Sequence, residues 1–347
     1  MATPISTPTH PPDGTPGPDA GTERPAEVAA QPGSAASRRL SPLSVAGLLV
    51  SVVCVAGVVW WALGQQPPQL PDSPAQWGAL LAAVGLYALA TLVRGERWRV
   101  LLREDGARPT RADAHGLNVV GYMGNNIFPA RAGDAIRVFL MAPRADASRR
   151  GVVGTLLAER LLDITVILIL FVVVGYGLLG EVGAGSVGWI ALATAVALTI
   201  AAVAVVLVRR NERLHRASGP ILSSTLRLRG RHGLALFAAT FLIWCIEAGV
   251  WMAVGRAAEV PMGPIEGCYL VALASVFALI PSGPGYAGTQ DAAAILGIKA
   301  LGGTGAQAVA YLVLLRFVIV VPITLLGLAL MAGRYGGLGR LRRARSA

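Results

Sequence analysis

Long uncharged apolar runs, separated by short arginine-rich segments, make up most of this sequence from residue 43 onward. Only 14% of the residues are charged, whereas a soluble domain carries about 25%. A helix of about 20 apolar residues spans the hydrocarbon core of a bilayer, where every backbone N–H and C=O must be paired within the protein. Because the runs are continuous and not alternating, they predict membrane-spanning helices and not the strands of a barrel.

Six runs are long enough to cross a bilayer. They are Leu43–Leu63, Trp77–Val93, Val152–Leu179, Val187–Val208, Leu234–Gly255 and Ala306–Ala332. The second is short, and we expect its helix to continue into the arginine-rich segment that follows it. The pattern therefore predicts an all-α polytopic membrane protein with about six transmembrane helices.

The basic residues outside the runs predict the orientation. Arginines precede the first run and follow the second, fourth and sixth, while the loops Gly64–Gln76 and Glu181–Ser186 contain no Lys or Arg. Positive loops stay in the cytoplasm. We therefore predict a multi-pass protein of the cell membrane with both termini cytoplasmic. The net charge of +11 is explained by arginines in loops that orient the protein and contact anionic lipid head groups. We therefore expect no nucleic-acid partner.

The sequence divides into a tail, a membrane domain and a second tail. Residues 1–42 are rich in Pro, Thr, Gly and Ala without a hydrophobic period, which is typical of a disordered segment. Residues 43–335 form the predicted transmembrane domain, and residues 336–347 form a basic tail. Both tails should be cytoplasmic.

Two semi-apolar stretches, Ala114–Met141 and Ile265–Ala300, do not fit as crossings, because both ends of each should lie on one side of the membrane. Each contains helix breakers near its middle. The breakers are Asn126, Pro129 and Gly133 in the first stretch, and Pro281, Gly283, Pro284 and Gly285 in the second. We interpret both as re-entrant hairpins, whose irregular backbone must be buried in protein or line a cavity. A helix lying in the membrane interface is the alternative.

The same order of parts occurs twice, as crossing, crossing, broken hairpin, crossing, over residues 43–180 and 187–332. The second half starts on the opposite side because three crossings is an odd number. Arg160 lies 31 residues beyond Pro129, and Arg316 lies 35 beyond Pro281. Inverted repeats with paired broken segments are typical of transporters, whose substrate site lies at the repeat interface. We therefore predict an inverted repeat.

Charged residues inside the apolar runs are the candidate substrate-binding site. They are Glu159, Arg160, Asp163, Glu247 and Arg316, together with Arg131, Asp134 and Arg137 after the first break. A charge at the bilayer centre costs about 2.5–3.5 kcal/mol, so such residues face a cavity or one another. Arg160 and Asp163 are spaced to pair on one helix face. The alternatives are structural ion pairs, such as Arg316 with Glu247, and an interfacial anchoring role for Arg131 and Arg137.

At these residues the sequence resembles the transmembrane flippase domain of lysylphosphatidylglycerol synthases and their stand-alone relatives. The resemblance covers residues 43–335. Its motifs are Arg94-x-x-Arg97-Trp98-x-x-Leu101-Leu102, Asn126-x-x-Pro129-x-Arg131-x-Gly133-Asp134-x-x-Arg137, Glu159-Arg160-x-x-Asp163, Pro281-Ser-Gly-Pro284-Gly285-Tyr286 and Arg316. The resemblance implies lipid translocation between leaflets, with two re-entrant segments meeting near mid-membrane. Many members carry a Glu soon after the second break; here the next acid is Asp291, which we include in the candidate substrate-binding site.

We therefore predict a flippase or transporter, and not an enzyme, that moves an anionic or modified lipid. Its partners would be an anionic phospholipid or polyprenyl-type lipid, and a lipid-modifying enzyme. The chain ends 15 residues after the last run, so we expect it not to make aminoacylated lipid itself. The sequence contains no HExxH, GxSxG or GxxxxGK[ST] nucleotide-binding loop. No metal or cofactor is expected. The alternatives are a membrane enzyme acting on a lipid head group and an accessory membrane subunit.

The predicted orientation can be tested by cysteine labelling in intact cells. A cysteine replacing Ser73, in a loop without Lys or Arg, should react with an impermeant maleimide added outside. A cysteine replacing Arg108, in a basic loop, should react only after the membrane is opened. The reverse pattern would contradict the orientation.

Overall fold

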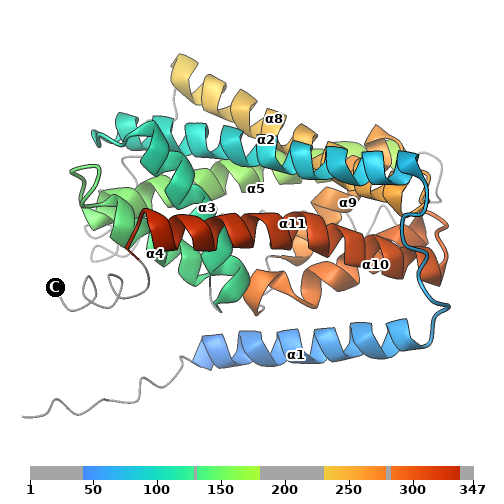
Figure 1. Ribbon diagram of the computed structural model, residues 1–347. Coiled ribbons are helices and arrows are strands. Elements are labelled where there is room, and N and C mark those ends of the chain that lie inside the picture. The colour runs from blue at the N-terminus through green and yellow to red at the C-terminus, as the bar shows by residue number, and fades with distance from the viewer. Residues whose placement is uncertain (1–41, 129–130, 180–229, 279–282, 337–347) are drawn as a thin grey trace, which may run out of the picture. The chain divides into compact units, whose positions relative to one another are not determined.

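The computed structural model describes residues 42–128, 131–179, 230–278 and 283–336, all within one compact unit, Leu40–Ala347. Within these ranges the chain is helical and contains no strand (Figure 1). The elements are α1 (Pro42–Leu63), α2 (Pro74–Glu104), α3 (Arg111–Ile127), α4 (Ala132–Met141), α5 (Arg149–Leu179), α8 (Gly230–Ala257), α9 (Pro264–Phe277), the 3-10 turn η1 (Pro284–Tyr286), α10 (Thr289–Ala300) and α11 (Gly305–Gly333). The all-α prediction is confirmed.

Three of the described helices, α2, α8 and α11, are long and apolar enough to cross a membrane. The helices α1 and α5 occupy the first and third predicted runs. The fourth predicted run, Val187–Val208, lies outside the described residues, as do residues 1–41 and 337–347. The protein is therefore a multi-pass membrane protein, and the count of six crossings stays a prediction.

The second crossing continues into its arginine-rich segment, as predicted. Helix α2 begins after Ser73, whose side chain accepts a hydrogen bond from the backbone N–H of Gln76 while the Gln76 side chain binds back to Ser73. Such a reciprocal cap satisfies backbone donors that the first helical turn leaves free. The helix then runs beyond the apolar run, and its last turns bury Arg94, Arg97 and Trp98. The extension therefore carries charge into the bundle.

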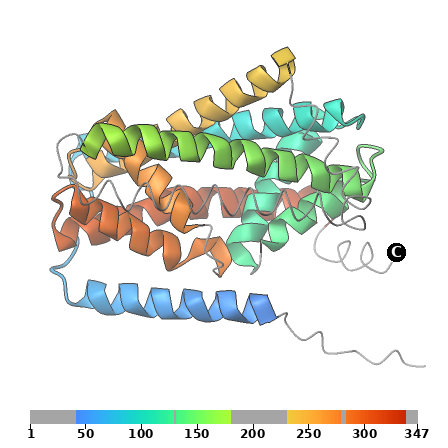
Figure 2. The same cartoon turned by 180° about the vertical axis from the view of Figure 1, so that it is seen from behind.

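Both predicted interruptions are helix–break–helix segments. The pair α3 and α4 lies toward one end of the long helices, and the pair α9 and α10 lies toward the other (Figures 1 and 2). The breaks meet: a Cβ built on Gly285 would lie 3.6 Å from Asn126 Oδ1, and the Arg131 guanidinium lies 5.0 Å from the centre of the Tyr286 ring. Pro129 and Pro281 lie outside the described residues, and re-entry into the membrane stays a prediction.

Helix α1 packs beside the second break. The Ser51 hydroxyl donates to the carbonyl oxygen of Ala287 and accepts from the Gly283 N–H at 2.9 Å. Gly288 has φ +89°, and a Cβ there would collide with Cys54 of α1. The second break is thus held from one side by α1.

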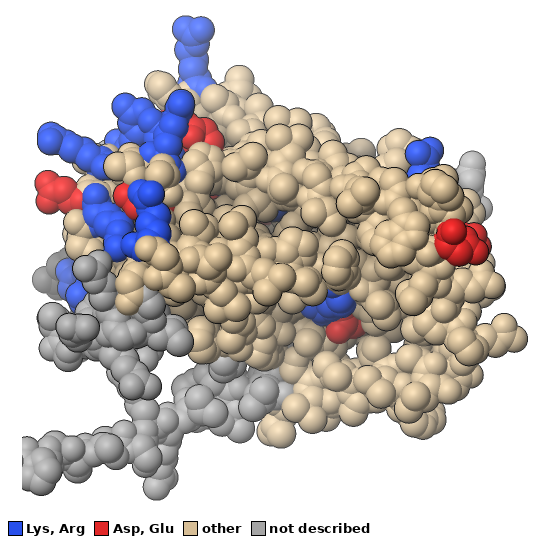
Figure 3. Space-filling view, in the orientation of Figure 1, with Lys and Arg blue, Asp and Glu red and all other residues tan. Residues whose placement is uncertain are grey.

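Charge is sorted along the bundle. Figure 3 shows basic side chains gathered mostly at one end, with mostly uncharged surface along the rest of this face. Exposed arginines from the last turn of α2, the loop after it and the starts of α3, α5 and α8 belong to this set: Arg103, Arg108, Arg111, Arg150 and Arg231. A basic end beside an apolar flank is the arrangement expected of a protein with one end in the cytoplasm.

Glycine allows α3 and α4 to approach closely. A Cβ on Gly133 would collide with the carbonyl oxygen of Gly121 and lie 2.6 Å from the backbone nitrogen of Asn125. Gly78 on α2 is different, because a Cβ added there meets no atom within 4 Å.

We expect Gly133→Ala to lower the free energy of unfolding by about 1–3 kcal/mol, because backbone must move to admit the methyl group. Gly78→Ala should be neutral or stabilise by up to about 1 kcal/mol, as Ala is the better helix former. Unfolding in detergent, followed by circular dichroism, measures both. Equal stability of the two variants would contradict the close approach.

Candidate functional site

A cluster of opposite charges lies between α2, α4, α5 and α8. Within the described part of the chain it contains four arginines and four carboxylates, so its formal charges cancel. The members are Arg94, Arg97, Arg137, Arg160, Asp134, Glu159, Asp163 and Glu247. Ions removed from water are tolerated when they are paired and hydrogen-bonded.

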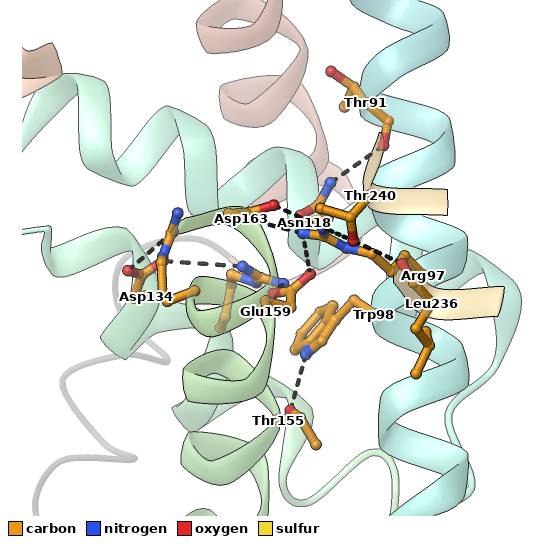
Figure 4. A network of polar contacts seen from close by, with 12 residues as sticks. Thr91, Arg97, Trp98, Asn118, Asp134, Thr155, Glu159, Asp163, Leu236 and Thr240 are labelled. Atoms are coloured by element: carbon orange, nitrogen blue, oxygen red, sulfur yellow. Dashed lines mark hydrogen bonds and ion pairs between the residues drawn. The ribbon is translucent and has the colours of Figure 1, made fainter. Parts of the chain in front are cut away.

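Arg97 lies at the centre of this cluster, with only 2% of its side chain exposed. Its Nη1 is 2.7 Å from Asp163 Oδ1 and donates to Thr240 Oγ1 at 2.9 Å (Figure 4). Its Nη2 is 3.5 Å from Glu159 Oε1. One guanidinium therefore ties α2 to both α5 and α8.

Arg137 of α4 is paired as closely as Arg97. Its Nη2 lies 2.8 Å from Glu159 Oε2, and its guanidinium carbon lies 3.9 Å from the ring centre of Trp98. The Trp98 indole N–H donates to Thr155 at 3.1 Å. Glu159 thus joins two arginines, and the indole ring covers one of them.

Arg94 binds Glu247 of α8, with Nη2 2.7 Å from Oε1. Its guanidinium carbon is also about 6 Å from the ring centres of Tyr122 and Trp244. Both charged side chains are nearly inaccessible to solvent. This pair is therefore largely shielded from bulk water.

Arg160 is the loosely held arginine of the cluster. Its Nη2 is 3.5 Å from Asp134 Oδ2, and 33% of its side chain is exposed. Asp134 also lies 3.9 Å from Arg137 and accepts from Asn125 Nδ2 at 3.5 Å. A shared carboxylate at these distances binds each partner more weakly than the pairs at 2.7–2.8 Å.

The second half repeats this pairing at a second site. Arg316 of α11 has its Nε 2.6 Å from Asp291 Oδ1 and donates through Nη1 to the carbonyl oxygen of Gly285 at 2.7 Å. Asp291 and Asp134 are each the third residue of the helix after a break. The partner arginines follow 25 and 26 residues later. These matching positions support the predicted repeat. They also show that Asp291 pairs with an arginine at the second break as Asp134 does at the first.

A cavity of about 130 Å³ lies where the two halves meet. Its lining comes from α2, α3, α5, α8, α9, η1, α10 and α11. The charged lining residues are Arg160 and Glu247. The aromatic lining residues are Tyr87, Tyr122, Trp244, Trp251 and Tyr286. Neutral polar groups complete it: Asn125, Asn126, Ser275 and Gln290. The volume exceeds the 10–15 Å³ that one water needs, so a small polar group fits.

The structure brings most of the predicted site residues together. Asp134, Arg137, Glu159, Arg160, Asp163 and Glu247 share one cluster, while Asp291 and Arg316 form the separate pair. Arg131 lies outside the cluster; it has φ +53° and donates to the carbonyl oxygen of Ala278 at 3.4 Å. It therefore connects the two breaks.

Two pairings considered from the sequence are wrong. Glu247 binds Arg94 and not Arg316, because the extension of α2 carries Arg94 to α8. Arg160 binds Asp134 of α4 and not Asp163, because Asp163 is taken by Arg97. For Arg160, a partner on a neighbouring helix thus replaces the neighbour on the same helix.

Sequence reasoning left Arg94 and Arg97 out of the candidate site, because arginines after an apolar run also suit a cytoplasmic loop. A signal was present: the two are three residues apart, so they share a helix face, and Trp98 follows directly. Among the described residues, no group of three or more His, Cys, Asp or Glu is placed to hold a metal ion.

Taken together, the apolar helices, the charge cluster and the cavity between two interrupted helix pairs define a multi-pass helical membrane protein with a polar centre. The particular family follows from the sequence comparison. The chain belongs to the family described as the lysylphosphatidylglycerol synthase TM region, whose model matches residues 44–327.

The chain is also similar to a protein of Haloferax volcanii named glycosyltransferase AglD. The two are 32% identical over 160 residues, which is 44% of this chain and 24% of that protein. The chain therefore matches about a quarter of the length of this relative.

Arg97→Gln should destabilise the protein by about 3–5 kcal/mol, because it leaves Asp163 buried without its ion-pair partner and leaves Glu159 paired with Arg137 alone. The exposed Arg103→Gln should change stability by less than about 0.5 kcal/mol. Unfolding in detergent measures both. Adding Asp163→Asn to Arg97→Gln should restore part of the loss, and a simple sum of the two single effects would show that the residues do not interact.

Proposed function

We propose that this protein moves a lipid with an anionic head group between the leaflets of the cell membrane. The observation that carries the proposal is the position of Arg160. This arginine has the loosest pairing of the cluster, is one-third exposed, and lines the cavity where the two breaks meet. A planar guanidinium with free donors is well suited to bind phosphate.

The charge balance of the cluster explains how binding and release could both occur. Arg94, Arg97 and Arg137 each have a carboxylate oxygen at 2.7–2.8 Å. Arg160 has Asp134 at 3.5 Å. An entering phosphate would compete with Asp134 for Arg160, and Asp134 would recover its partner when the lipid leaves. An isolated arginine would hold the phosphate too firmly, and a fully paired one would not attract it.

The two interrupted helix pairs would supply the route. In this proposal α3 with α4, and α9 with α10, enter the membrane from opposite sides as re-entrant hairpins of an inverted repeat. Arg316 would meet the head group from the outer half, but only after its bonds to Asp291 and Gly285 open. A lipid-modifying enzyme would supply or consume the lipid, which would be an anionic phospholipid or a polyprenyl-type lipid.

The second candidate function is an enzyme acting on a lipid head group. The name of the Haloferax volcanii relative favours it. Incubating the purified protein with a nucleotide sugar and a polyprenyl phosphate tests it directly, since sugar transfer would produce a new lipid.

Arg160→Gln should slow lipid movement by about tenfold or more in liposomes containing the purified protein, because it removes the charge offered to the phosphate. The unfolding temperature should change little, since this arginine is the most weakly paired of the cluster. Fluorescent phosphatidylglycerol with dithionite quenching measures the rate. Arg256→Gln, an exposed arginine at the end of α8, is the matched control. Full transport by Arg160→Gln would leave the cluster with a structural role only.

A further inference from the structure

The two predicted halves of the protein are interlocked. Helix α3 of the first half packs against α11 of the second, and α9 of the second half packs against α5 of the first (Figures 1 and 2). Each interrupted pair is therefore bound to the last helix of the opposite half. Transporters with inverted repeats commonly open by rocking one repeat against the other. In this protein such a movement would pull both of these contacts apart.

The contact between α3 and α11 is close. A Cβ on Gly327 of α11 would collide with the Met123 side chain of α3 and would lie 3.2 Å from the carbonyl oxygen of Val119. Asn126 Nδ2 donates to Thr324 Oγ1 at 3.0 Å. Small residues let the backbones of neighbouring helices approach each other, and such packing is what holds helices together in lipid.

A buried tyrosine closes the basic end of the same contact. Tyr335, two residues after α11, is fully buried, and a Cβ on Gly116 of α3 would collide with its hydroxyl oxygen. The neighbouring Arg334 has its Nη2 3.2 Å from Asp113 Oδ1. A hydrogen bond, close packing and an ion pair thus hold nearly the whole length of α3 against α11.

The contact between the two breaks is weaker. Arg131 donates to the carbonyl oxygen of Ala278 at 3.4 Å, which is longer than the usual distance of about 2.7–3.2 Å. Its guanidinium carbon lies 5.0 Å from the ring centre of Tyr286. Arg131 is exposed, and a cation–π contact is weakest at an exposed site. The breaks are therefore held to each other less firmly than α3 is held to α11.

The same contact joins two residues with a strained backbone. Arg131 has φ +53° and Tyr286 has φ +55°, and among the described residues Asp146 and Glu259 are the other non-glycine residues with positive φ. A left-handed backbone is costly for a residue with a Cβ, and such residues cluster in segments that switch between conformations. Tyr286 also lines the cavity, so a movement of its turn changes access to the cavity.

We infer that the breaks separate at the contact between Arg131 and Tyr286 during transport, while α3 stays on α11 and α9 stays on α5. The inference rests on the proposed function and deepens it by naming the contact that controls access to the cavity. Among the described residues, this separation breaks one long hydrogen bond and no ion pair. Rocking of the halves would break the ion pair of Arg334 with Asp113 and expose Tyr335.

Covalent bridges test which contact must open. In a variant whose 3 cysteines are replaced by alanine, Arg131→Cys with Tyr286→Cys places one new pair of thiols across the breaks. Asp113→Cys with Arg334→Cys places a second pair between α3 and the end of α11. A short bismaleimide bridges either pair. N-ethylmaleimide, which labels both thiols without joining them, is the matched control.

Movement of fluorescent phosphatidylglycerol in liposomes is the measurement. Bridging the breaks should slow it about tenfold or more relative to the N-ethylmaleimide control, because a gate that cannot open blocks the route. Bridging α3 to α11 should change the rate by less than about twofold, because that contact persists while the gate moves. A bridge between α3 and α11 that stops transport, or a bridge between the breaks that leaves the rate unchanged, overturns the inference.

A second lock keeps the test decisive where substitution of Arg131 itself stops transport. Asn126→Cys with Gly285→Cys suits a disulfide, because a Cβ on Gly285 lies 3.8 Å from the Cα of Asn126. The oxidised form should be about tenfold slower than the reduced form, and equal rates would overturn the inference. The proposed function fails separately, if the unmodified protein moves no more lipid than protein-free liposomes do.

Discussion

The cost of placing charge in a low-dielectric interior governs the arrangement of this protein. Eight charged side chains lie among apolar helices, and each has an opposite charge within 4 Å. Arg97 is the centre of this arrangement because it bonds α5 and α8 from α2. An ion pair in such surroundings adds little net stability, yet it penalises every arrangement that separates the partners. The cluster therefore selects which helices are neighbours more than it strengthens their contact.

The same constraint acts on the backbone at the two breaks. Interrupted helices leave carbonyl and N–H groups unpaired, and in hydrocarbon these must find partners within the protein. At the second break Arg316 binds the carbonyl oxygen of Gly285, and Ser51 of α1 serves Gly283 and Ala287. At the first, Arg131 reaches across to the second break. The backbone of the second break is consequently held by side chains of other segments.

The sequence was sufficient to predict the helical class, both interruptions and six members of the cluster, since apolar length, helix breakers and intramembrane charge are local signals. The pairing of those charges was not predictable. Glu247 has two candidate arginines, Arg94 and Arg316, and the choice depends on how α2 and α11 are rotated against α8. Rotation is a property of the packed bundle and has no local signature. The position of Trp244 at the cavity was not predictable for the same reason. A tryptophan in an apolar run is expected to face lipid unless its neighbours in the bundle are known.

The arginines lie in two environments, and ionic strength affects the two groups differently. Exposed arginines such as Arg103 and Arg231 at the basic end are surrounded by water, where about 0.15 M salt screens charge beyond about 8 Å. Arg94, Arg97 and Arg137 are shielded from mobile ions, so their pairs are screened far less. Raising the salt concentration should therefore screen the charge of the basic end while the internal ion pairs persist.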